Sequence, residues 1–146
     1  MMKLNKVLKT YVAAVLTSAL LIGGTAAAAT DDDIPTEISF NNVVVTKSAS
    51  AQVSKKAQKA KANDDAKITL STIISVNDEV SAYVINASGT IVSQESAKFR
   101  GTSAGATKSA PYRSGDGKKG KNYRLLISLS QSSQSSQLTV AGSFAP

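Results

Sequence analysis

The run GDGKKGKN at 115–122 has spacing close to that of a nucleotide-binding loop. Gly115, Gly120 and Lys121 meet the G-x-x-x-x-G-K pattern, but Asn122 follows where a Ser or Thr would hold magnesium. A true phosphate loop also joins a strand to a helix, whereas this run leads into a strongly alternating, strand-like pattern. We therefore interpret it as a glycine-relaxed turn with weak anion-binding capacity and predict no bound nucleotide or cofactor.

Catalytic residue types are scarce. The chain has no histidine and no cysteine, which excludes His-dependent catalytic triads, disulfides and thiolate zinc sites. No pair of carboxylates is placed as a glycosidase requires, and most fall in predicted turns. Ser and Lys are abundant, yet no strand-turn-helix elbow or S-x-x-K helix accompanies them. The sequence predicts a non-enzymatic protein without catalytic residues or metal ligands. Aromatic residues make up only 5%, which argues against a nucleic-acid surface built on base stacking.

Lysines are the remaining candidates, as contacts for an anionic partner. They fall in two segments, and the candidate residues are Lys55, Lys56, Lys59, Lys61, Lys118, Lys119 and Lys121. The first segment, 47–65, contains only Val53 and alanines as apolar residues, so a helix there would have no face to bury. We expect a mobile basic linker or an extended, frayed hairpin. It would contact teichoic acid or anionic lipid, or else form a solvated loop.

Residues 1–29 have the pattern of a secretory signal peptide. Three lysines precede an apolar run at 11–22 that is too short to span a bilayer. Small residues at Ala27 and Ala29 suit cleavage after Ala29, and cleavage after Ala28 fits nearly as well. The alternative is an uncleaved N-terminal anchor. Cleavage after Ala29 leaves 14 Lys and Arg against 10 Asp and Glu, so the net charge falls from +7 to +4. We expect a secreted, extracellular protein with no stable membrane span after processing.

Period-two patterning dominates the rest of the chain. Strands are expected at 37–46, 66–76, 122–130 and 137–144, together with a hairpin over 79–99 whose return strand is 91–99. The expected fold is all-β, a small antiparallel β-sandwich (or small barrel) of about six to eight strands, preceded by the signal-peptide helix. The expected organisation is a signal peptide at 1–29, a first strand with basic linker at 30–65, and the sandwich core at 66–146.

The C-terminal third resembles an uncharacterised family of small secreted β-sandwich proteins of Gram-positive bacteria. The matching positions are Tyr112, the Gly-Lys loop at 117–119, the strand at 125–127, the Ser-rich turn at 132–136, and Val140, Gly142 and Phe144 of a V-x-G-x-aromatic ending. Phe144 stands where that family usually has Trp. The resemblance implies fold and export rather than activity. A more distant relation is to lactococcin-like bacteriocins, which are richer in His, Trp and Tyr.

These observations predict a small secreted protein that acts at the bacterial envelope by binding an anionic cell-wall polymer or an envelope protein. The alternative is a bacteriocin-like toxin or its accessory factor.

Overall fold

The computed structural model describes residues 34–146, so the predicted signal peptide lies outside the described residues. Antiparallel strands make up the regular structure of this part, and it contains no helix. The strands are β1 (Ile38–Thr46), β2 (Ala51–Gln52), β3 (Ala57–Gln58), β4 (Ala66–Leu70), β5 (Val80–Asn86), β6 (Ala97–Phe99), β7 (Ala106–Ala110), β8 (Asn122–Leu129) and β9 (Gln137–Ala145). The expected all-β class is confirmed, and the described residues form nine strands where about six to eight were expected.

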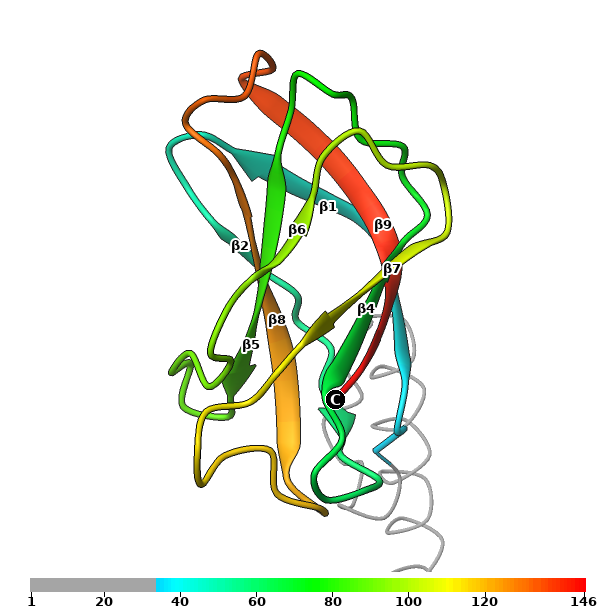
Figure 1. The fold of residues 1–146 in the computed structure, drawn as a ribbon, viewed down its shortest axis with the longest axis vertical. Helices are drawn as coiled ribbons and strands as arrows, with labels where there is room; N and C mark the ends of the chain where they lie inside the picture. The colour runs from blue at the N-terminus through cyan, green and yellow to red at the C-terminus, as the bar shows by residue number, and fades with distance from the viewer. Residues whose placement is uncertain (1–33) are drawn as a thin grey trace, which may run out of the picture. The chain divides into compact units, whose positions relative to one another are not determined.

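The strands form two antiparallel sheets (Figure 1). One has the order β1-β9-β4-β7, and the other has the order β2-β8-β5-β6 with β3 also paired to β8. The last two strands in sequence, β8 and β9, therefore occupy inner positions in different sheets. Most pairings join strands far apart in the chain, so neither sheet can form from a local hairpin alone.

Both sheets contribute to one hydrophobic core. Alternate residues of β8 are buried, including Leu125 and Ile127 at 0% exposure, as the period-two pattern predicted. Ile68 and Phe144 are equally buried on the other sheet. No helix among the described residues is long and apolar enough to cross a membrane.

Gly142 allows two strands to approach each other closely. It pairs with Leu70 of β4 on one side and with Phe40 of β1 on the other. A β-carbon at this position would lie 2.0 Å from the carbonyl oxygen of Thr69. The glycine in the V-x-G-x-aromatic ending is thus explained by the space available between β9 and β4.

Three strand boundaries differ from expectation. The strand predicted at 66–76 ends at Leu70, and Val76 is 66% exposed rather than on the buried face. The return strand predicted at 91–99 is reduced to isolated bridges and the short β6. Strand β7 was not predicted, because its sequence ATKSA has no apolar alternation. Its pairing with β4 supplies the backbone hydrogen bonds that define it.

The segment 47–65 also differs from the expected linker or hairpin. Its short strands β2 and β3 pair with β8 and not with each other. Val53 and Ala57 are buried in the core at 2% and 0% exposure. The alanines are small enough to lie against the larger side chains of β8, with Ala57 opposite Tyr123. This segment therefore forms an edge of the sheet that contains β8. It belongs to the single compact unit Ile34–Pro146.

Candidate functional site

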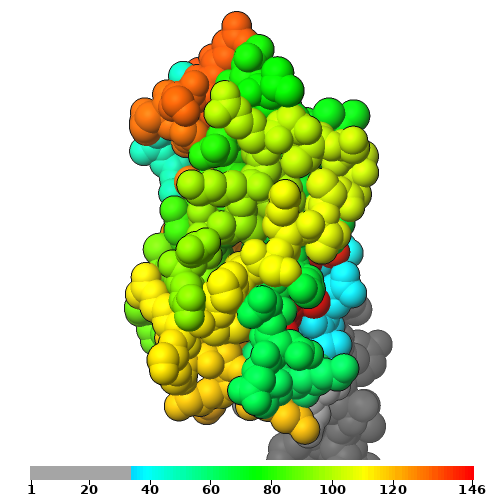
Figure 2. Space-filling model, in the orientation of Figure 1, coloured from blue at the N-terminus to red at the C-terminus, as the bar shows by residue number. Residues whose placement is uncertain are grey.

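The structure brings the two lysine-bearing segments together. The amide of Lys59 donates to the carbonyl of Lys121 at 2.9 Å, and the amide of Gly120 donates to the carbonyl of Lys59 at 2.9 Å. The Gln58 side chain donates to the Gly120 carbonyl at 3.3 Å. Figure 2 shows the 59–65 turn and the 113–121 loop next to each other at the lower end of the molecule.

The predicted anion-contacting lysines fall into three groups. Five are exposed on these two segments and are called here the lysine cluster: Lys56, Lys61, Lys118, Lys119 and Lys121. Lys55 is exposed too, but its ammonium donates to the backbone carbonyl of Ser39 on β1 at 3.1 Å. Lys59 is buried at 1% exposure, so it differs from the expected surface residue.

Lys59 forms an internal contact beneath the cluster. Its Nζ donates to the Asp64 carbonyl oxygen at 2.6 Å and lies 4.5 Å from the centroid of the Tyr112 ring. Burial of the ammonium lowers the pKa of Lys59, and the charges of Asp64 and Asp65 partly oppose that shift. A cation over an aromatic face is attracted by the ring quadrupole. Lys59 therefore fixes the path of its segment.

Two tyrosines hold the glycine-lysine loop in place. The rings of Tyr112 and Tyr123 are tilted by 58° with centroids 5.2 Å apart. The amide of Lys118 donates to the Tyr123 hydroxyl at 2.9 Å. Gly117 has a φ of +68°, and a β-carbon there would come within 2.6 Å of the Tyr112 ring. The loop leads directly into β8, so it lacks the helix that a nucleotide-binding loop would have.

The hydroxyl of Tyr112 is buried without a hydrogen-bond partner. Burial raises the pKa of Tyr112 well above its usual range, because the tyrosinate would be poorly solvated there. The neighbouring Tyr123 and Asp65 act in the same direction. The ring therefore remains neutral beneath the cluster.

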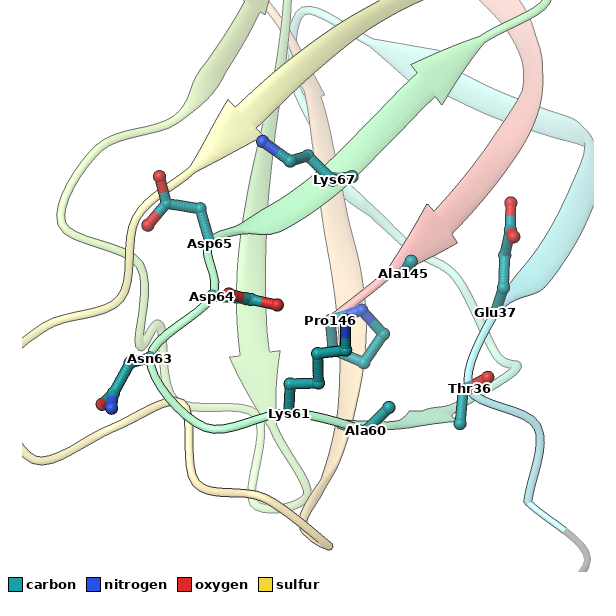
Figure 3. Close-up of a pocket in the computed structure, with 10 residues that line it drawn as sticks. All are labelled: Thr36, Glu37, Ala60, Lys61, Asn63, Asp64, Asp65, Lys67, Ala145 and Pro146. Carbon is teal, nitrogen blue, oxygen red and sulfur yellow. The ribbon is translucent and has the colours of Figure 1, made fainter.

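A hollow of about 640 Å³ opens beside the lysine cluster (Figure 3). Its polar lining has both signs of charge: Glu37, Asp64 and Asp65 against Lys61 and Lys67. Within residues 34–146, no group of three or more His, Cys, Asp or Glu side chains is arranged to hold a metal ion. The mixed lining makes the hollow a continuation of the charged surface.

Asp78, one of the carboxylates in predicted turns, binds a backbone amide in the structure. Asp78 is buried at 5% exposure and accepts hydrogen bonds from the amide and the hydroxyl of Ser135, both at 2.8 Å. The backbone hydrogen bond from Ser135 is the largest cause that lowers the pKa of Asp78. This carboxylate therefore joins the connection before β5 to the connection before β9.

Two cations outside the predicted lysine set share a surface. Arg124 on β8 and Lys98 on β6 both lie on the outer face of one sheet, because their strand neighbours Tyr123, Leu125, Ala97 and Phe99 belong to the core. The period-two pattern shows which face of its own strand each residue occupies, but not which strands lie in the same sheet. Only the pairing of β6, β5 and β8 shows that the two faces are the same.

Comparison of the chain with protein-family models, with curated proteins and with solved structures finds no match.

Proposed function

We propose that this chain is a secreted, non-enzymatic β-sandwich protein that binds an anionic polymer of the bacterial envelope through the lysine cluster. The observation that carries the proposal is the backbone hydrogen bonding between Lys59 and Lys121, which joins the two lysine-bearing segments. Lysines 57 or more positions apart in sequence thereby act on one surface.

The charge balance around the cluster favours an anionic ligand. The lysine cluster presents five exposed ammonium groups, and the acidic residues of the same two segments are Asp64, Asp65 and Asp116. Exposed charge pairs are weak individually, and salt screens them over roughly 10 Å at 0.1 M. A polymer with repeated negative charges compensates by contacting several lysines at once. Phosphate-bearing wall polymers such as teichoic acid have that chemistry.

Sedimentation with purified cell walls across a salt series tests the proposal. We expect binding at low salt that falls steeply as salt rises. The double variant Lys118→Gln/Lys119→Gln should weaken it, whereas the control Arg100→Gln/Lys108→Gln removes equal charge from exposed positions outside both lysine-bearing segments. Binding that ignores salt, or equal losses in the two double variants, would contradict the proposed mechanism.

Export is tested separately. We infer that residues 1–29 are removed, and the motivating pattern is the short apolar run followed by Ala27 and Ala29. Mass spectrometry of the protein recovered from culture supernatant should give a mature N-terminus at Thr30. A cell-associated protein that retains Met1 would contradict the inference.

A further inference from the structure

The outer face of the β2-β8-β5-β6 sheet has an arrangement that the lysine cluster does not account for. Core-facing residues alternate with outward ones on β8 and β6, and Val80, Ala82 and Val84 of β5 belong to the core. On the other face of β5, Ser81 and Ile85 are also buried, so Tyr83 is the strand residue that is partly accessible there. Tyr83, between them, is therefore directed outward and is half-buried. The outward strand positions of this sheet, all within residues 34–146, have no carboxylate; they are Gln52, Gln58, Ser81, Tyr83, Ile85, Lys98, Asn122, Arg124, Leu126 and Ser128.

The strand register places Tyr83 midway between two cations. Lys98 on β6 pairs with Ser81, and Arg124 on β8 pairs with Ile85. Tyr83 is two residues from each of these β5 positions, and β6 and β8 flank β5 on opposite sides. With strands about 4.8 Å apart and about 3.4 Å per residue, each cation is displaced from Tyr83 by about 8 Å along one diagonal.

The same diagonal has an apolar centre. Leu126 lies directly opposite Tyr83 on β8, and both side chains are half-buried. An aromatic ring beside an aliphatic side chain gives a small apolar platform with a polar hydroxyl at one end. The pattern along the line is therefore cation, apolar platform, cation.

The line runs toward the lysine cluster at its Arg124 end. Gln58 on β3 pairs with Asn122, two positions before Arg124, and Lys56 precedes β3. Beyond Gln58 comes the backbone junction between Lys59 and Lys121. Cations thus continue from one end of the sheet across its outer face without an intervening outward carboxylate.

We propose that this face binds a phosphate-bearing glycan strand, with a sugar ring over Tyr83 and Leu126 and phosphates at Arg124 and Lys98. The inference rests on the proposed function and specifies its ligand. Charge complementarity selects an anionic occupant. The apolar platform between the cations selects one that presents a ring or apolar face between its charges, which a bare polyanion does not have.

The test compares soluble sugar-bearing teichoic acid with inorganic polyphosphate, which has the charge but no ring. Arg124→Gln and Lys98→Gln should each weaken both ligands by about two- to fivefold. Tyr83→Thr, which keeps a strand-favouring residue, should weaken teichoic acid by about three- to tenfold and leave polyphosphate unchanged. The matched control is Val44→Thr, an exposed apolar residue (47%) on the other sheet. Far-UV circular dichroism and thermal unfolding verify that each variant is folded.

The outcomes separate the inference from the proposed function. If Lys118→Gln/Lys119→Gln weakens teichoic acid binding but Tyr83→Thr does not, the platform is overturned and the proposed function stands. If Tyr83→Thr weakens the binding of teichoic acid and of polyphosphate equally, the proposed platform is also overturned. A further arm uses vesicles of anionic phospholipid, where Tyr83-dependent binding stronger than that of teichoic acid would assign the face to lipid instead. If the unmodified protein binds neither polymer, both proposals fail.

Discussion

Replacing Gly142 with alanine should destabilise the protein through one steric contact. The added β-carbon would lie 2.0 Å from the Thr69 carbonyl oxygen, whereas ordinary contacts begin at 3.4 Å. Strands β9 and β4 would have to separate by about 1.4 Å at a position where their backbones are already paired with Leu70. The carbonyl belongs to the backbone, so no side-chain rotation can relieve the clash.

The loss in free energy of unfolding can be estimated from the interactions that are weakened when β9 and β4 separate. Two ladder hydrogen bonds weakened at about 0.5–1.5 kcal/mol each, and a packing cost of about 1–3 kcal/mol, act against folding. Alanine also has less conformational freedom than glycine in the unfolded chain, which stabilises the folded state by about 0.4–1 kcal/mol. We therefore expect a net loss of about 2–4 kcal/mol, which lowers the melting temperature by about 6–20 °C in a domain of this size.

Urea and thermal unfolding followed by far-UV circular dichroism measure this loss. Ser143→Ala is the matched control, because it changes the adjacent residue of the same strand on the outward face and should alter stability by no more than about 0.5 kcal/mol. A melting temperature for Gly142→Ala within about 2 °C of the unmodified protein would refute the close-approach argument.

Three further predictions concern Asp78, Lys59 and Gly117, which hold loops in place. Asp78 has a lowered pKa in the folded state, so its contribution to stability is present above the unfolded pKa and is lost as pH falls through the folded value; Asp78→Asn should flatten the acid limb of a stability–pH curve. Lys59 also has a lowered pKa, but for a cation this means that stability rises with pH between the folded pKa and 10.5; Lys59→Met should abolish that rise in urea midpoints measured below about pH 9, where the tyrosines of the unfolded chain are still protonated. Gly117→Ala should shift the Tyr112 ring and cost about 1–3 kcal/mol, visible as a changed near-ultraviolet tyrosine signal; an unchanged signal and stability would contradict that packing.

The sequence predicts strands well where alternation is strong. The alternating pattern of 122–130 and 137–144 corresponds closely to β8 and β9, because both lie inside their sheets and bury one face. The edge strand β1 was predicted from its apolar residues, but the short strands β2 and β3 and the polar strand β7 were not. Strand β7 depends on pairing with β4 for its definition, and β2 and β3 depend on pairing with β8, so their own residues carry little apolar signal.

The candidate site shows the same division between local and long-range information. Composition and spacing identify the lysines, but no local pattern indicates that Lys59 is buried over Tyr112 while its neighbours are exposed. The outer-face line through Tyr83 depends on the register of three strands. Register is determined by the whole fold, and a shift of one residue would direct Tyr83 into the core.

The junction between Lys59 and Lys121 would link the proposed ligand binding to the folding equilibrium. These residues are brought together only when β3 pairs with β8, so an unfolded chain has the same charges but spreads them over a long, fluctuating segment. A polymer that needs both segments at once would bind the native state preferentially and would raise its stability in proportion to the logarithm of ligand concentration. If the proposed function holds, such a polymer would retain correctly folded molecules and release chains that had lost their strand pairing.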